Sequence, residues 1–189
     1  TRTYNTVINA YAKSGEKGSA SKAEQLLVEM EQRSETEKNL KPNIRTCNTV
    51  IHACASTKHR EDRDAAIEIA FRTFKNLSSA ENISPTQVTY SSLLSVLRHL
   101  VPSSPPNERL SLSKLLFQEC CNAGCVNNGV LNVLSKTVPL KSYVELVGSA
   151  AKDFNHFCSL IQPISSPVIS PTLPVVAPVI APAPVAPVL

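Results

Sequence analysis

The sequence has few of the residues that aromatic cores and phosphate-binding loops require. Its 189 residues include no Trp, five Phe, four Tyr and five Gly, while 42% of the residues are hydrophobic. The core must therefore be mainly aliphatic. The few glycines form no Gly-rich loop that would hold a phosphate group, and no cluster of carboxylates suits a metal-dependent nuclease. We therefore expect a protein that is not an enzyme and that uses no cofactor and no small-molecule substrate.

Charged residues are absent from the last part of the chain. The formal net charge is +4, and no residue after Asp153 carries a formal charge. The positive excess therefore lies on the preceding part of the chain, where it is compatible with RNA or an acidic protein as a partner.

The end of the chain is rich in proline and apolar residues. From Pro163 it reads PISSPVISPTLPVVAPVIAPAPVAPVL. Its prolines remove backbone donors and clash with helix formation, so we expect no membrane partner. We interpret residues 159–189 as a disordered, polyproline-type tail. A role as the ligand of a proline-binding protein partner is the alternative.

The cysteines lie in apolar periodic segments and not in a loop-rich disulfide framework. We expect them to be reduced and mostly buried. The run CCNAGC lacks the second Cys or His pair that a zinc site needs, so core thiols are favoured over a metal site. The six cysteines are Cys47, Cys54, Cys120, Cys121, Cys125 and Cys158.

The sequence contains an internal repeat. The segment TYNTVINAYAKSG near the start is followed by the similar segments TCNTVIHACASTK and TYSSLLSVLRHLV. Asn5, Asn48 and Ser91 occupy the same place in the three copies and are 43 residues apart, as are Pro42 and Pro85. Such a fixed period indicates a repeat architecture.

Each copy is predicted to be a pair of helices. Apolar residues recur at helical spacing in the first segment, as at Tyr4, Val7 and Ile8, and a second periodic segment follows a polar break. Ser19 or Ser21 is expected to cap the second helix of the first copy. Successive pairs must stack to bury their apolar faces. We therefore predict an all-α, right-handed solenoid of stacked antiparallel helix pairs, with repeats at 1–43, 44–86 and 87–128 and a degenerate repeat or capping helices at 129–158.

The motif TYNTVINAYAKSG…AEQLLVEM…KPN resembles the pentatricopeptide repeat, a two-helix RNA-binding unit. The resemblance covers roughly residues 1–128. The chain departs from the family pattern because its first two units are longer, with extra residues between their helices and near their ends, and because the third has an insertion at VPSSPPNER.

The resemblance implies that each repeat reads one base of single-stranded RNA through the fifth and the last residue of the motif. An Asn amide carries both a donor and an acceptor for a pyrimidine edge, and a Ser hydroxyl leaves room for a purine. The implied readers are Asn5 with Asn43 for a pyrimidine, preferably cytosine, Asn48 with Thr86 for a pyrimidine, and Ser91 with Asn128 or Asn127 for adenine.

The resemblance also implies contacts beside the bases. The second motif residue, which is Arg2, Arg45 or Val88 in the three units, would stack between bases, where the family usually has an aliphatic residue. Lys13 and His99 stand where the family contacts phosphate. The competing interpretation is that the Asn and Ser residues satisfy backbone amides near a helix start and that the arginines are simply solvated.

These features lead to one preferred function and two alternatives. We expect sequence-selective binding of single-stranded RNA in organelle RNA processing, stability or translation. The first alternative is a tetratricopeptide-like scaffold that binds a peptide partner, and the second is the RNA-binding arm of a protein-only tRNA-processing nuclease. Because the chain begins within a motif and without Met, we expect a fragment of a longer mitochondrial or plastid protein whose targeting segment is missing.

Overall fold

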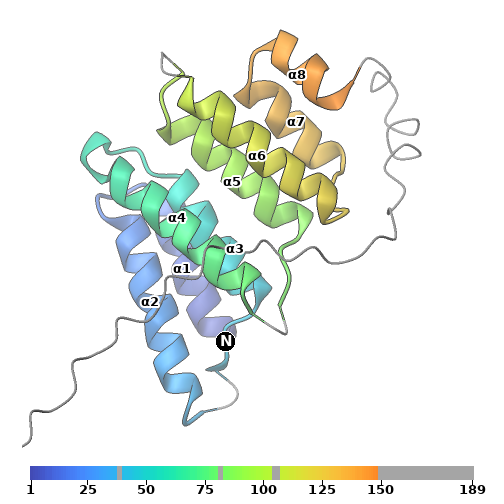
Figure 1. Cartoon of the computed structure of the whole chain (residues 1–189). Helices are drawn as coiled ribbons and strands as arrows, with labels where there is room; N and C mark the ends of the chain where they lie inside the picture. The colour runs from blue at the N-terminus through green and yellow to red at the C-terminus, as the bar shows by residue number, and fades with distance from the viewer. Residues whose placement is uncertain (38–39, 81–82, 104–106, 149–189) are drawn as a thin grey trace, which may run out of the picture.

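The computed structural model describes residues 1–37, 40–80, 83–103 and 107–148, and this part of the chain contains eight α-helices and no strand. Figure 1 shows their arrangement. The predicted tail and Cys158 lie outside the described residues. The elements are α1 (Arg2–Ser14), α2 (Ser19–Ser34), α3 (Ile44–Ala55), a 3₁₀ turn (Arg60–Asp62), α4 (Arg63–Ser78), α5 (Gln87–Leu100), α6 (Glu108–Asn122), α7 (Asn128–Thr137) and α8 (Leu140–Val147).

The helices form a stack of pairs. α1, α3, α5 and α7 lie in one row, each packed against the next, while α2, α4 and α6 pack on that row from one side (Figure 1). α2 also contacts α4. The predicted all-α solenoid of stacked helix pairs is therefore confirmed for the described residues, whereas the repeat boundaries stay a prediction.

The core is mainly aliphatic, as the composition predicts. The middle helices of the row carry its most buried side chains, such as Ile51 on α3 and Leu93, Leu94 and Leu97 on α5, none of which is exposed to solvent. Two of the few aromatic rings meet in this core, where Phe74 of α4 contacts Tyr90 of α5 edge to face at 5.7 Å. Burial of this apolar stripe on both sides explains why the first helix of each pair has the clearest repeat pattern.

The starts of the first helices share one capping arrangement. Asn43, Thr86 and Asn127 immediately precede α3, α5 and α7 in extended backbone conformation. The Asn43 Oδ1 accepts from the amide N–H of Thr46 at 3.1 Å. This satisfies a backbone donor that the first helical turn leaves unpaired. The repeat therefore sets the register of each first helix through its last residue.

The predicted serine cap of α2 is wrong. The N-cap is Gly18, whose φ of 73° is a left-handed conformation that favours glycine. The Ser19 hydroxyl instead donates back to the carbonyl of Glu16. The Gly18 amide donates to Asp62 Oδ2 at 2.7 Å, so it is the following repeat that satisfies the start of α2.

The five described cysteines are free thiols, and two of them, Cys54 and Cys120, are fully buried. The expectation that most cysteines are buried therefore holds only in part, since Cys47, Cys121 and Cys125 are half-buried. Burial raises the pKa of Cys54 and of Cys120 to about 12. Among the described residues there is no group of three metal-ligating side chains and no helix long and apolar enough to cross a membrane.

Candidate functional site

The starts of α1, α3 and α5 enclose two neighbouring hollows, which we call the reading groove. The first, of about 520 Å³, lies between α1 and α3, and the second, of about 530 Å³, lies between α3 and α5. They are continuous, since both include Asn9, Arg45 and Thr49. The first is lined by Thr1, Arg2, Asn5, Thr6, Asn9, Asn43, Arg45 and Thr49. The second is lined by Asn9, Ile44, Arg45, Asn48, Thr49, His52, Thr86, Gln87, Val88 and Ser92.

The first hollow brings together the residues that the sequence predicts as a pair. Asn5 of α1 and Asn43 from the cap of α3 line it, together with the exposed Arg2 and Arg45. The Asn5 Oδ1 is buried and has no hydrogen-bond partner. A buried acceptor without a donor is costly, and no hydrogen bond within the described residues holds this oxygen in place.

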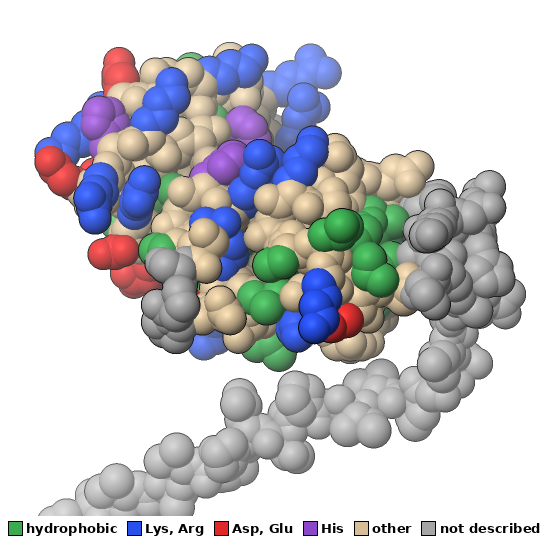
Figure 2. Space-filling view, turned by 90° about the horizontal axis from the view of Figure 1, so that it is seen from above, with side chains coloured by type: hydrophobic (Ala, Val, Ile, Leu, Met, Phe, Trp, Pro, Cys, Tyr) green, Lys and Arg blue, Asp and Glu red, His purple; other side chains and the backbone are tan. Residues whose placement is uncertain are grey.

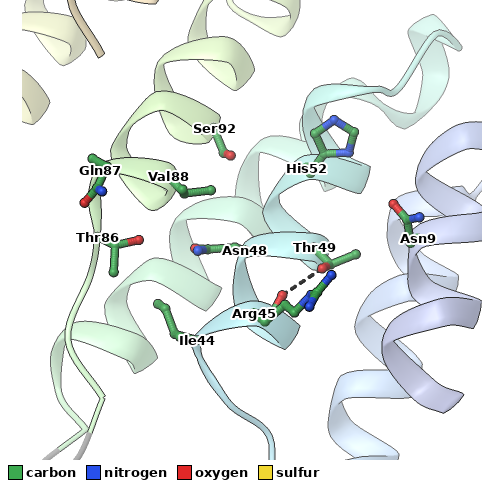
Figure 3. Close-up of a pocket in the computed structure, with 10 residues that line it drawn as sticks. All are labelled: Asn9, Ile44, Arg45, Asn48, Thr49, His52, Thr86, Gln87, Val88 and Ser92. Carbon is green, nitrogen blue, oxygen red and sulfur yellow. Dashed lines mark hydrogen bonds between the residues drawn. The ribbon is translucent and has the colours of Figure 1, made fainter. Parts of the chain in front are cut away.

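The second hollow brings together the second predicted pair. Asn48 of α3 and Thr86 at the start of α5 extend toward one another, with Val88 beside them, while the Arg45 side chain lies beyond Asn48 and points toward Asn9 of α1 (Figure 3). The Val88 side chain is 51% exposed, so it offers an apolar surface. An aliphatic group of this kind can pack against the face of a flat ring.

The third predicted pair lies outside both hollows. The Ser91 hydroxyl donates to the carbonyl of Val88 at 3.0 Å, within its own helix. Its partner is Asn127 by register, since Asn127 and not Asn128 occupies the cap position that Asn43 and Thr86 hold. The Asn127 Oδ1 accepts from the amide of Val130 at 2.9 Å.

The same register adds a residue that the sequence interpretation missed. Asn132, exposed on α7, lies five residues after its cap, as Asn48 and Ser91 do in their repeats. The repeat period is shorter at this point than between the earlier copies, so a search at a fixed period passes over it. The segment NNGVLNVL contained the signal, because Asn132 follows Asn127 by five residues, as Asn48 follows Asn43.

The competing capping interpretation, made for Asn5, Asn48 and Ser91, does not describe their hydrogen bonds, whereas the last residues of the repeats do cap helices. Asn43 and Asn127 do cap helices through their carbonyl oxygens, and each keeps its NH₂ group for another partner. Asn48 does not act as a cap, because its Oδ1 accepts from the Thr89 hydroxyl of the next repeat at 2.7 Å. The Asn5 oxygen has no partner at all.

A separate hollow of about 400 Å³ lies at the opposite ends of the same helices, between α1, α3 and α5. Lys13 and His99, both predicted phosphate contacts, line it together with Lys58. Figure 2 looks down on this end of the molecule, where Lys, Arg and His side chains gather. The His99 ring is held 3.0 Å from the carbonyl of Ala55 through its Nδ1.

Lys58 is another residue that the sequence interpretation missed. In the second copy the place of Lys13 is taken by Ser56, which carries no charge, and Lys58 follows two residues later. The Lys58 side chain lies over Gly15, since a Cβ added there would be 2.9 Å from its Nζ. The lysine of the second repeat therefore reaches back to the end of α1.

Comparison with known proteins identifies the first part of the chain. Residues 1–56, which include α1, α2 and α3, match the PPR (pentatricopeptide) repeat family. No curated protein and no solved structure matches the chain.

Proposed function

We propose that this chain, a helical repeat protein whose residues 1–56 match the pentatricopeptide repeat family, binds single-stranded RNA in the reading groove. The observation that carries this proposal is the joint placement of both predicted reading pairs in one continuous groove. Each hollow is also lined by second-position side chains, which can stack on a base. Two successive nucleotides would then place one base in each hollow.

The charges of the molecule support an anionic ligand on this side. Among the described residues, no ion pair involves Arg2, Arg45, Lys13 or Lys58. In contrast, Arg72 of α4 pairs with Glu24 at 2.6 Å and with Glu68 at 2.8 Å. Phosphate groups can therefore neutralise Arg2 and Arg45 at the reading groove, and Lys13 and Lys58 in the separate hollow at the opposite ends of α1 and α3.

The wider role follows from the small number of repeats. Three or four repeats read too few bases to specify one transcript, so we propose that the chain acts within a longer array or with a partner. The family resemblance supports a role in RNA processing, stability or translation in a mitochondrion or plastid. Pentatricopeptide repeat proteins are generally not catalytic, and we propose binding and not catalysis as the activity of this chain.

Replacing both reading asparagines tests the proposal. Asn5→Ala with Asn48→Ala should weaken binding of a short single-stranded RNA by about 1–3 kcal/mol per base read, because each change removes a hydrogen-bonding amide from one hollow. The measurement is fluorescence anisotropy of labelled RNA with the full chain at several salt concentrations. Wild-type affinity should fall as salt rises.

The control is Asn76→Ala, which removes an exposed amide from α4 in the second layer. It should leave RNA affinity unchanged, and far-ultraviolet circular dichroism should show equal helicity in all variants. Equal affinity of the double variant and the wild type across a panel of RNA sequences would contradict reading by these residues. Binding of peptides with no binding of RNA would indicate a protein scaffold instead.

A further inference from the structure

We propose that Thr89 is a specificity-determining residue, which acts by holding the amide of Asn48 in one orientation. This inference rests on the proposed function and concerns the second hollow of the reading groove. With its oxygen held toward the buried hydroxyl of Thr89, Asn48 turns its NH₂ group away from Thr89, so that a base would meet N–H donors. The hollow between α3 and α5 therefore distinguishes uracil from cytosine, whereas the hollow between α1 and α3, also built on an Asn, lacks this restraint.

The orientation follows from the hydrogen bonds of one buried hydroxyl. Thr89 is fully buried, and its Oγ1 accepts from the amide N–H of Thr86 at 3.0 Å. It also lies 3.3 Å from the Thr86 hydroxyl and 2.7 Å from the Asn48 Oδ1. A hydroxyl has a single proton, and the shortest contact, to the Asn48 oxygen, receives it. The Thr86 hydroxyl is then the donor in the remaining contact.

The consequence for a bound base is a fixed polarity. An Asn amide that can turn over can present either its donor or its acceptor to a base, but an amide whose oxygen is bonded to a buried hydroxyl stays in one orientation, with its NH₂ group turned the other way. Uracil and cytosine have opposite donor and acceptor patterns at ring positions 3 and 4. A donor that is held in place therefore favours one of them at whichever of these positions it meets.

The first repeat provides a natural comparison. Thr46 occupies the place of Thr89, is equally buried, and likewise accepts from the amide of its cap residue, here Asn43, at 3.2 Å. Its hydroxyl, however, donates to the Asn43 Oδ1 at 3.3 Å, and the Asn5 Oδ1 keeps no partner. The Asn43 cap presents a carbonyl oxygen to the Thr46 hydroxyl and so takes its proton. The Thr86 cap instead donates its own proton to the Thr89 hydroxyl, which remains free to donate to Asn48.

The next first helix, α7, has no hydroxyl that could hold the fifth residue of the preceding repeat. Val130 of α7 stands where Thr46 and Thr89 stand in their helices, three residues after the cap. Its side chain has no hydroxyl, so Ser91 receives no bond of this kind. Among the described first helices, the restraint on the fifth residue is therefore present at Asn48 and absent at Asn5 and Ser91.

The test compares Thr89→Val, which keeps the shape of the side chain but removes the hydroxyl, with Thr89→Ser, which restores it. The full chain is titrated with RNA oligonucleotides that differ only by uracil or cytosine at one position. The nucleotide that faces Asn48 is identified with the Asn48→Ala variant: it is the RNA position at which this variant loses the preference between uracil and cytosine. We expect the wild type and Thr89→Ser to prefer one pyrimidine by roughly 2- to 10-fold and Thr89→Val to lose most of that preference.

Thr46→Val is the matched control. It removes an equally buried hydroxyl from a helix start but should leave the pyrimidine preference at the position facing Asn5 unchanged. Within the wild type, the preference facing Asn48 should exceed that facing Asn5, a comparison that does not depend on any variant folding.

Three results would overturn the inference. The first is a Thr89→Val protein that keeps the full wild-type preference between uracil and cytosine. The second is a wild type with equal preference at the positions that face Asn48 and Asn5. Neither result would contradict RNA binding itself. The third is the absence of RNA binding by the wild type, which would remove the proposed function and this inference together.

Discussion

Single side chains at the helix starts have two different roles in this protein. The residue before α3 or α5 caps that helix, and the residue five places later lies in or beside the reading groove. Asn43 combines the two roles, since its oxygen bonds the Thr46 amide while its side chain lines the first hollow. Because the cap is needed for stability in any case, a capping Asn is not by itself a sign of RNA binding.

The register at α7 can be tested by stability alone. Asn127→Ala should lower the free energy of unfolding by about 1 kcal/mol, because it removes the acceptor of the Val130 amide at the start of the helix. Asn128→Ala should change it much less, since Asn128 is the first helical residue. Urea denaturation followed by circular dichroism measures both. A larger loss for Asn128→Ala would contradict the register that makes Asn127 the equivalent of Asn43 and Thr86.

Two helices are followed by glycines in a left-handed backbone conformation. α1 ends at Gly15, whose φ of 63° is left-handed, and α6 is followed by Gly124 with the same φ. A side chain in this conformation is strained, which is why glycine suits both places. The two positions differ in their surroundings, because Lys58 lies over Gly15 while no atom lies within 4 Å of a Cβ added at Gly124.

That difference gives a prediction for the helix ends. Gly15→Ala and Gly124→Ala should each lower the free energy of unfolding by about 1–2 kcal/mol through the left-handed backbone. Only Gly15→Ala should also weaken RNA binding, because its methyl group displaces the Lys58 ammonium group from the end of α1. Denaturation and anisotropy titration on the same samples separate the two effects. Equal RNA affinity for both variants would show that Lys58 does not contact the ligand in this position.

The first helices of the repeats were predictable, whereas several helix starts were not. The apolar period of α1, α3 and α5 is visible in the sequence, because each of these helices packs against the next along the row, and α3 and α5 have a neighbour in the row on both sides. The Gly18 cap of α2 was missed because the Asp62 that bonds its amide is remote in sequence. The place of Asn127 was ambiguous because the repeat shortens before α7.

The side chains of the groove were likewise predictable only in part from the sequence. Sequence alone predicted which residues pair, since the pairing follows from the repeat register, and the structure brings two of the three pairs into the hollows. The sequence did not predict which threonine hydroxyl would donate to which asparagine side chain. Thr46 and Thr89 are the same residue in the same place, yet their hydroxyls donate to different partners. That choice depends on the cap residue and on distances of a few tenths of an ångström.

The whole molecule presents two surfaces of different character. One carries the reading groove with Arg2 and Arg45, and the other, formed by α2, α4 and α6, carries ion pairs such as Arg72 with Glu24. Exposed ion pairs of this kind add little stability, but they leave less positive charge to attract a polyanion. An RNA strand should therefore bind along the row of first helices and not along the second layer.

Ultraviolet crosslinking of the full chain to a random pool of single-stranded RNA, followed by mass spectrometry of the crosslinked peptides, tests this claim most directly. We expect crosslinks at the starts of α1, α3 and α5, within residues 1–9, 43–52 and 86–92, and their loss when excess unlabelled RNA is added. Crosslinks confined to α2, α4 and α6, or no crosslinks at a salt concentration that permits binding, would contradict an RNA-reading groove on this face.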